Sequence, residues 1–420
     1  MPSQSAARKP NIILILADDL GYECLGCYGG KSYATPRLDK LAATGVRFQR
    51  GYALPLCTPT RAQLMTGKYN FRNWRAFGIL DPAERTFGHF MKEAGYKTCI
   101  SGKWQFYSYN PPDFEPEWRG KGMRPEESGF DEYCLWHTEH TEDKGSRYAD
   151  PTIQQNGEYL QDTEGKYGPD IYTKYITDFI ERNQDDPFFV YYPMALTHGP
   201  FMPTPRSSDW PHNRHNNDPK NFKDMVEYMD EVIGRIVDKL DELELREDTL
   251  ILFLGDNGSP REIHTEVNGH TIQGGKGLST DAGTRVPFIV NWLGATPSGA
   301  VCDDLVDCSD FIPTMMEAAN APLPENGPFD GVSFLPQVRG EAGNPRAWIF
   351  SHHDPLPGWG KVGYRLQRWA QDKRWKLYDT GELFDYAADV MEKKALSPGQ
   401  GGPEAESARR QLQMVLDQMR

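Results

Sequence analysis

The feature that most constrains the fold is a set of short apolar runs that each end in a polar or glycine-rich turn. The runs cover Asn11–Ala17, Lys97–Ser101, Phe188–Leu196 and Thr249–Leu254. Helical patterns lie between them, at Pro36–Thr44, Thr86–Glu93, Ile171–Arg182 and Asp224–Leu240. This alternation is typical of an α/β fold with a large, mainly parallel mixed sheet sandwiched by helices. In such sheets ligands bind beyond the carboxyl ends of the strands, so we expect the polar turns to share one functional edge.

The pattern changes after about residue 346. Two strand-like segments, Tyr364–Ala370 and Arg374–Tyr378, flank a short polar turn and predict an antiparallel hairpin. The segment Ala405–Met419 predicts a closing helix. We therefore expect two domains, a large α/β domain over residues 1–345 and a smaller C-terminal subdomain with an antiparallel sheet over residues 346–420.

The charge balance restricts the class of partner. The chain has 420 residues, with 46 basic and 60 acidic side chains and a formal net charge of −14. Nucleic acid and anionic membranes are bound by positively charged surfaces, so neither is expected as the main partner. A small anionic substrate in a locally basic pocket is still compatible with this composition.

The apolar run Ile12–Ala17 resembles a short signal sequence, but Asp18 and Asp19 end it after a handful of residues. A secretory core is longer, and a membrane span needs ~20 apolar residues. The sequence therefore predicts no membrane span. We expect a periplasmic or extracellular protein if a signal peptide was trimmed from the precursor, and a cytoplasmic protein otherwise.

The most informative segment is Cys57-Thr58-Pro59-Thr60-Arg61. Thr58 is a good N-cap, Pro59 suits the first helical position and Gly67 suits the C-terminal cap, so Cys57 is expected at a helix N-terminus. Such an end binds anions through free N–H groups and the helix dipole. Arg61 is then placed to present its guanidinium to a tetrahedral oxyanion. A buried cysteine before an ordinary capped helix explains these residues equally well.

Two pairs of polar residues follow apolar runs. Asp18 and Asp19 follow the first run, and Asp256 and Asn257 follow the fourth. Taken singly, each pair is an ordinary polar turn. Together on one sheet edge they supply an all-oxygen ligand set, which suits a hard divalent cation such as Ca²⁺ or Mg²⁺.

The Cys-x-Pro-x-Arg segment resembles that of the type I sulfatases of the alkaline phosphatase superfamily. The resemblance extends over nearly the whole chain, from Pro10–Gly21 to Glu382–Asp385. It implies that a formylglycine-generating enzyme, a transient partner, oxidises Cys57 to formylglycine, whose hydrate is the nucleophile. It also implies one divalent cation, Ca²⁺ in preference to Mg²⁺, with these ligands: Asp18, Asp19, Asp256, Asn257 and the oxidised Cys57.

The resemblance further implies which residues act on the sulfate. Arg61, Lys103 and Lys276 match residues that contact the sulfate, with Lys276 beside the leaving-group oxygen. His198 matches a histidine that contacts the same oxygen and, as imidazolium, protonates the departing alcohol.

One position departs from the family pattern. Where the family usually has Gly-Lys-Trp-His, this chain has Gln105 after Trp104. A glutamine forms hydrogen bonds but takes up no proton at neutral pH. Another base, a slower step or an altered substrate geometry would each account for it, and His264 and His270 are candidate substitutes.

The expected substrate is a small-molecule or oligosaccharide sulfate ester, with a sulfated carbohydrate first. Aromatic and hydrogen-bonding side chains in loops are candidates to contact it: Gln105, Tyr107, Trp136, His137, His140, Arg147, His352, His353, Trp359 and Arg365.

Two other functions are compatible with the sequence. A phosphodiesterase or phosphonate monoester hydrolase on the same scaffold shares the Cys-x-Pro-x-Arg residues. The other is a non-catalytic binder of sulfated glycans, in which Cys57 stays a thiol. In that case Gln105 is an early sign that catalysis has been lost.

Overall fold

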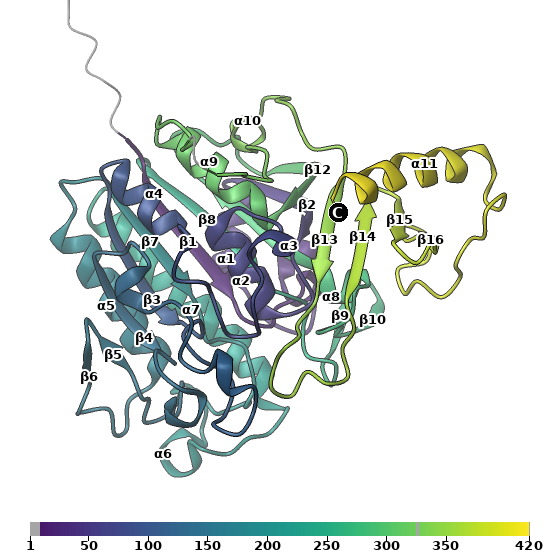
Figure 1. Ribbon diagram of the computed structural model, residues 1–420. Helices are drawn as coiled ribbons and strands as arrows, with labels where there is room; N and C mark the ends of the chain where they lie inside the picture. The colour runs from purple at the N-terminus through teal and green to yellow at the C-terminus, as the bar shows by residue number, and fades with distance from the viewer. Residues whose placement is uncertain (1–8, 325–326, 420) are drawn as a thin grey trace, which may run out of the picture.

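The computed structural model describes residues 9–324 and 327–419. A ten-stranded mixed sheet runs through the larger part of the molecule in the order β12-β2-β11-β8-β1-β7-β3-β4-β5-β6 (Figure 1). Its strands are β1 (Asn11–Ala17), β2 (Val46–Tyr52), β3 (Lys97–Lys103), β4 (Glu132–Trp136), β5 (Gln154–Gln155), β6 (Glu158–Tyr159), β7 (Phe188–Pro193), β8 (Thr249–Gly255), β11 (Arg285–Asn291) and β12 (Ala300–Asp307).

The central strands β8, β1, β7, β3 and β4 are mutually parallel, whereas β11 pairs antiparallel with both β8 and β2. Burial explains why these strands have continuous apolar sequences. All seven residues of β1 are buried, since helices cover both faces of the sheet. The predicted α/β fold class is confirmed.

The two faces of β1 belong to different apolar cores. Ile13 and Ile15 pack with helices α1 (Pro36–Ala43), α5 (Gly168–Arg182) and α7 (Asn221–Glu242). Ile12 and Leu14 pack with α2 (Cys57–Thr66), α4 (Phe87–Glu93), α9 (Phe311–Ala318) and α10 (Leu335–Val338). Three short helices complete the larger part: α3 (Asn70–Asn73), α6 (Trp210–Asn213) and α8 (Asp281–Thr284). A separate antiparallel hairpin of β9 (His264–Val267) and β10 (His270–Gln273) lies between β8 and α8.

A separate four-stranded antiparallel sheet follows near the C-terminus (Figure 1). It consists of β13 (Ile349–His353), β14 (Gln367–Gln371), β15 (Trp375–Tyr378) and β16 (Leu383–Asp385), and helix α11 (Gly402–Gln418) packs on it. The predicted hairpin is therefore present, with its first strand starting at Gln367 instead of Tyr364. The domain boundary after residue 345 stays a prediction.

Candidate active site

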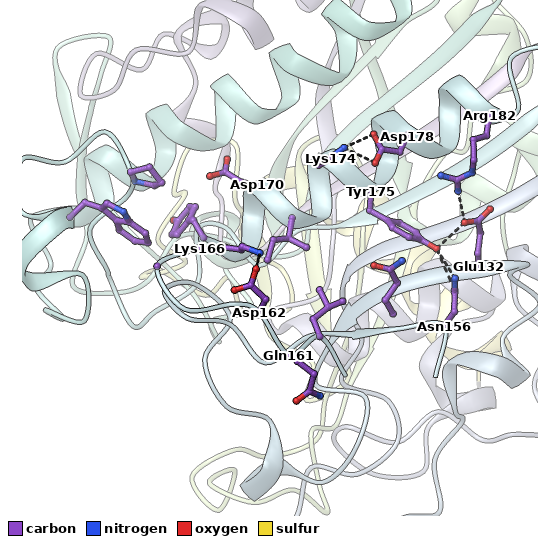
Figure 2. A pocket seen from close by; sticks show the side chains of 17 residues that line it. Glu132, Asn156, Gln161, Asp162, Lys166, Asp170, Lys174, Tyr175, Asp178 and Arg182 are labelled. Carbon is purple, nitrogen blue, oxygen red and sulfur yellow. Dashed lines mark hydrogen bonds and ion pairs between the residues drawn. The ribbon is translucent and has the colours of Figure 1, made fainter. Parts of the chain in front are cut away.

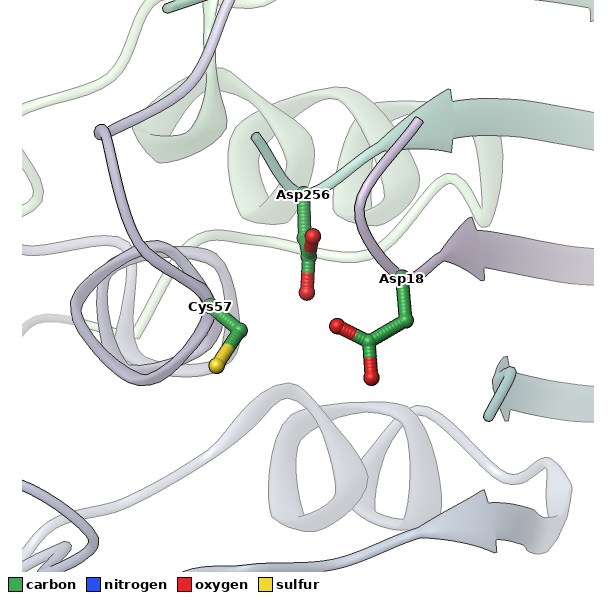
Figure 3. Close-up of side chains that lie close together, drawn as sticks. All are labelled: Asp18, Cys57 and Asp256. Atoms are coloured by element: carbon green, nitrogen blue, oxygen red, sulfur yellow. The ribbon is translucent and has the colours of Figure 1, made fainter. Parts of the chain in front are cut away.

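Two acidic residues follow the carboxyl ends of neighbouring parallel strands. β1 and β8 pair along their whole length, so that Ala17 lies opposite Gly255. Asp18 and Asp256 come next in each chain segment and therefore meet at one edge of the sheet. Figure 3 shows Asp18, Asp256 and Cys57 pointing toward one another, and their potential ligand atoms all lie within 4.8 Å.

The third member of this group, Cys57, is the first residue of α2. The residue before it has extended backbone, so the helix begins two residues earlier than the predicted cap at Thr58 implies, and the Thr58 hydroxyl has no hydrogen-bond partner among the described residues. Gly67 does end the helix in a left-handed conformation, as predicted. Cys57 is 3% exposed at the helix end whose free N–H groups attract anions.

Charged side chains around Cys57 are paired with one another. The Arg61 guanidinium lies 2.9 Å from Asp256 and 3.7 Å from Asp18. The Lys103 ammonium lies 2.8 Å from Asp18. We call the six residues of this network the charged floor: Asp18, Asp19, Asp256, Arg61, Lys103 and Lys276.

Lys276 reaches the charged floor from a glycine-rich loop, and its ammonium lies 2.5 Å from Asp19. The backbone N–H of the next residue, Gly277, donates to the Pro55 carbonyl at 2.8 Å, which ties this loop to the segment before Cys57. Gly277 has φ +80°, and a Cβ there would lie 2.4 Å from the Tyr364 hydroxyl. Glycine is therefore required at this position.

The C-terminal sheet holds the other end of the same loop. The buried Lys376 of β15 donates to the Ser279 carbonyl and to Glu392, the latter at 2.9 Å. The Tyr378 hydroxyl donates to Ser279 Oγ at 2.8 Å. The position of Lys276 therefore depends on a sheet that lies more than seventy residues further along the chain.

The two buried aspartates of the strand ends differ in their titration. Burial opposes ionisation of Asp18, but Lys103, His198 and Arg61 outweigh it and hold its pKa well below the ordinary value. Burial, reinforced by the charge of Asp18, raises the pKa of Asp256 to about 7. The two carboxylates therefore repel each other unless positive charge lies between them.

The donor set fits a hard divalent cation. Asp18 Oδ1 and Asn257 Oδ1 are buried and have no hydrogen-bond partner among the described residues. Asn257 Nδ2 donates to Asp19 Oδ1 at 2.9 Å, which turns its own oxygen toward the group. Unpartnered buried oxygens and like-charged carboxylates are both stabilised by a cation with oxygen ligands. The sulfur of Cys57 is a soft ligand and is the exception in this set.

His198 lies beside the charged floor, with Nε2 3.8 Å from Asp19. Its burial lowers the pKa of the imidazole to about 3, although Asp19 acts in the opposite direction. In this state the neutral imidazole is favoured over the imidazolium expected from the sequence. A neutral ring donates a hydrogen bond through only one nitrogen.

Gln105 contacts Cys57, with Sγ and Oε1 3.9 Å apart. Its backbone is left-handed, with φ 61°, and its N–H donates to the His137 carbonyl at 3.1 Å. The candidate substitutes lie elsewhere: His264 and His270 are exposed on the β9–β10 hairpin.

Four of the predicted substrate-contacting residues lie on or after β4. Trp136 is 2% exposed and the Arg147 guanidinium covers its ring at 4.0 Å, so it offers no free face for a sugar. His137 is also buried, and its ring lies 6.1 Å from that of Tyr109. His140 is half-buried and its Nδ1 lies 3.0 Å from Ser108 Oγ.

The other predicted contacts come from the C-terminal part. His352 is half-buried with its ring 6.2 Å from Phe71. His353 is fully buried, and its ring lies 6.0 Å from Tyr364. Arg365 is exposed and donates to the carbonyl of its own neighbour Tyr364. Among the predicted substrate contacts, Gln105 is thus the residue that the structure places in contact with Cys57.

Two lysines beside the site carry no sequence signal. Burial lowers the pKa of the Lys361 ammonium, and the positive charges of Lys276 and Lys103 act in the same direction. Burial and the charges of Arg147 and Lys103 lower the pKa of Lys144 to about 8. No motif surrounds either lysine, and both lie in loops whose course depends on the whole fold. We call Lys144, Arg147 and Lys361 the cationic rim.

A cavity of about 990 Å³ lies away from these residues, between α5 and the β5–β6 hairpin (Figure 2). Its polar lining is paired internally: Lys174 with Asp178 at 2.8 Å, and Arg182 with Glu132 at 2.7 Å. Its lining contains none of the predicted site residues. The size of this cavity alone is therefore no evidence that it is the active site.

Comparison with known proteins identifies a family. The family model described as Sulfatase matches residues 10–321. Human arylsulfatase A is 31% identical over 393 residues, which cover 84% of this chain and 73% of that protein. The N-acetylgalactosamine-6-sulfatase of Canis lupus familiaris is 29% identical, with 90% and 75% covered.

Among solved structures, Ps i-CgsB in complex with k-i-k-neocarrahexaose is similar with a TM-score of 0.78 and 26% identity. The match covers 97% of this chain and 93% of that chain. Among the described residues, no helix combines the length and apolarity that crossing a membrane requires.

These relatives do not favour a phosphodiesterase, a phosphonate hydrolase or a non-catalytic binder. Members of the family generally use a formylglycine and a divalent metal ion. The chain belongs to the sulfatase family, with its alkaline phosphatase-like fold, and is a sulfuric ester hydrolase.

Proposed function

We propose that this sulfatase hydrolyses a sulfate ester of a sulfated carbohydrate, with the oxidised Cys57 as nucleophile and with Ca²⁺ as the metal ion. The observation that carries the proposal is the convergence of Asp18, Asp256 and Cys57 at one sheet edge. A formylglycine-generating enzyme is the transient partner that oxidises Cys57.

The ligands of the cation in this proposal are Asp18, Asp19, Asp256 and Asn257, together with the oxidised Cys57. Oxidation replaces the soft sulfur with oxygen and so removes the exception in the ligand set. Ca²⁺ accepts six to eight oxygens in flexible geometry, which suits four side chains from two strand ends. When bound, the ion polarises the sulfate and favours the ionised nucleophile.

The cations of the charged floor hold the sulfate. Arg61 presents a planar fork, and the α2 N-terminus adds backbone N–H groups on the same side. Lys103 and Lys276 neutralise the oxygens on which charge builds up. This binding orients sulfur toward residue 57.

His198 and Lys276 act on the departing alcohol. Nδ1 of His198 lies 2.6 Å from the Gly199 carbonyl, which only accepts hydrogen bonds, so in the neutral imidazole that burial favours Nδ1 carries the proton and Nε2 accepts a hydrogen bond from the departing alcohol. Asp19 outweighs burial and raises the pKa of Lys276, so its ammonium stays protonated and stabilises the negative charge on the leaving oxygen. Gln105 orients the hydroxyl groups at residue 57 by hydrogen bonding and does not act as a base.

The carbohydrate part of the proposal has two supports. One relative is named an N-acetylgalactosamine-6-sulfatase, and a similar structure was solved with a neocarrahexaose. In this chain Trp359 is 44% exposed, and its ring lies 6.0 Å from Tyr109, which packs near Cys57. An exposed aromatic side chain next to a residue that packs against the nucleophile suits stacking on a sugar.

The test is release of inorganic sulfate from a panel of sulfated mono- and oligosaccharides. The protein is produced together with a formylglycine-generating enzyme. A mass decrease of about 18 Da in the peptide that contains Cys57 verifies its oxidation to formylglycine. Cys57→Ala is the catalytic control. Sulfate release that disappears in the control is expected, whereas silence across the panel from oxidised protein would overturn the proposal.

A further inference from the structure

The cationic rim consists of three positive side chains that lack a carboxylate partner. Arg147 is 8% exposed, and its Nη1 has no hydrogen-bond partner among the described residues. In the part of the chain that the structure describes, no ion pair to a carboxylate involves Lys144, Arg147 or Lys361. An unpaired buried cation is unfavourable in the free protein, so its presence indicates an anionic ligand.

Aromatic rings hold these cations instead. Lys144 Nζ lies 5.9 Å from the Tyr109 ring centre, and Lys361 Nζ lies 5.8 Å from the same ring. Lys361 also lies 4.3 Å from the ring centre of Phe77, and Arg147 covers Trp136 at 4.0 Å. Cation–π contact keeps a charge in place without neutralising it. The rim therefore keeps its positive charge available to a ligand.

The rim lies next to the nucleophile. Tyr109 packs in a cluster with Leu56, Cys57 and Phe77. Arg147 lies near enough to His198 for their charges to interact, and Lys361 lies near enough to Lys276 and Lys103 for the same. The rim comes from two distant segments, around residue 145 and around residue 361, and Lys144 and Lys361 from these segments meet at the Tyr109 ring.

The scissile sulfate does not account for the rim. The charged floor already provides Arg61, Lys103 and Lys276, each within 3 Å of a buried carboxylate. The rim adds three more positive charges in a chain whose formal net charge is −14. A local surplus of this kind against an acidic background indicates a second negative group on the ligand.

We propose that the cationic rim binds a second anionic group, a sulfate or carboxylate on the same saccharide as the scissile sulfate. This inference rests on the proposed function and narrows it to a saccharide with at least two negative groups. Lys144 and Lys361, which both lie within 6 Å of the Tyr109 ring centre, contact this group, and Arg147 contributes its unpartnered Nη1.

The test uses pairs of saccharides that share one scissile sulfate and differ only in the presence of a second sulfate or carboxylate. Lys144→Met and Lys361→Met each remove one rim charge while keeping an unbranched side chain of similar length. Arg147→Lys retains the positive charge but removes the planar guanidinium fork. Lys174→Met, from the surface pair with Asp178 on α5, is the matched control.

We expect the unmodified enzyme to prefer the doubly charged member of a pair. Each rim methionine variant lowers this preference about tenfold through KM, while kcat/KM for the singly charged member stays within about twofold. Lys174→Met leaves the preference unchanged. Equal losses on both members of the pair would overturn the proposal, because the rim would then contact the scissile sulfate. Unchanged preference in both methionine variants, with melting temperatures unchanged, would also overturn it.

A binding measurement separates this proposal from the proposed function. Calorimetric titration of Cys57→Ala protein with the same saccharide pairs requires no turnover. Tighter binding of the doubly charged member, reduced about tenfold by Lys361→Met, supports the rim even if no sulfate is released. Equal affinity for both members overturns the rim even if sulfate is released. Replacing the second sulfate with a carboxylate distinguishes the two sources of negative charge.

Discussion

The charged floor and the cationic rim use the same kinds of side chain in opposite ways. On the floor every lysine and arginine lies against a carboxylate, as with Lys103 at 2.8 Å from Asp18. On the rim the cations lie on aromatic rings, as with Arg147 at 4.0 Å from Trp136. Paired charges hold a fixed geometry that serves any sulfate ester. Unpaired charges gain their partner only from the ligand, so they distinguish one ester from another.

The largest expected effect separates the two regions by their kinetic signature. Lys276→Ala removes a floor cation beside the proposed leaving oxygen, and we expect kcat to fall by about 10²–10³-fold on singly and doubly charged esters alike. Steady-state kinetics on one matched saccharide pair measures this. A loss confined to KM of the doubly charged ester would assign Lys276 to the rim and break the distinction.

The effect of Ca²⁺ on the stability of the folded protein also distinguishes the charged floor from the cationic rim. Added Ca²⁺ at 100 times its Kd is expected to stabilise the folded protein by about 2.7 kcal/mol, seen as a rise in melting temperature. Asp256→Asn is expected to lose this rise, since it removes a floor carboxylate. Lys361→Met should keep it in full. A rise that survives in Asp256→Asn would place the ion elsewhere.

Acid is expected to weaken the structure that supports the rim. Burial, with help from the charges of His352 and Lys361, lowers the pKa of His353 to about 3, and both ring nitrogens lack partners among the described residues. In the unfolded chain His353 is protonated near pH 6.5, whereas in the folded chain it stays neutral down to about pH 3. Stability present above pH 6.5 is therefore lost as the pH falls, by about 2 kcal/mol at pH 5.

Urea unfolding at pH 7 and pH 5 measures this loss. His353→Gln cannot be protonated and is expected to show a smaller difference between the two pH values than the unmodified protein. Tyr364, whose ring packs against His353, is retained in both proteins. An identical difference in the variant would assign the acid sensitivity to other groups.

A smaller effect tests the aromatic base of the rim. Tyr109→Leu removes the ring shared by Lys144 and Lys361, which contributes about 1 kcal/mol of cation–π stabilisation. We expect the preference for the doubly charged ester to fall about fivefold, with kcat less affected. Tyr109→Phe, which keeps a ring, should retain the preference. Equal losses in the two variants would argue against the ring as the support.

The smallest effect is expected outside both regions. Lys166 lines the cavity in Figure 2 and pairs with Asp162 at 2.8 Å. Lys166→Met should leave kcat/KM within about twofold for every ester, as for an ordinary surface substitution. A selective change for the doubly charged ester would show that the positive region extends beyond the rim.

The sequence predicts the floor better than the rim for a physical reason. The run that forms β1 is correctly bounded at Asn11–Ala17 because continuous apolarity marks a strand buried on both faces. The residue after such a strand necessarily lies at the ligand-binding edge, which applies to Asp18 and Asp256. By contrast, β2 escapes prediction because Arg47, Gln49 and Arg50 interrupt its apolar pattern.

The rim has no comparable local signal. Lys144 and Lys361 are single lysines in loops, and neither periodicity nor spacing distinguishes them from solvated surface lysines. Trp136 illustrates the converse, since its aromatic character suggested sugar stacking whereas the fold buries it beneath Arg147. Loop residues acquire their surroundings from tertiary structure alone.

The bond from Lys376 to the Ser279 carbonyl has a consequence in time. Lys376 is synthesised roughly 320 residues after Cys57, which takes on the order of tens of seconds on a ribosome. Until then, the glycine-rich loop that carries Lys276 lacks the anchor that the C-terminal sheet provides. During translation, Cys57 is therefore synthesised well before the C-terminal sheet that completes its site.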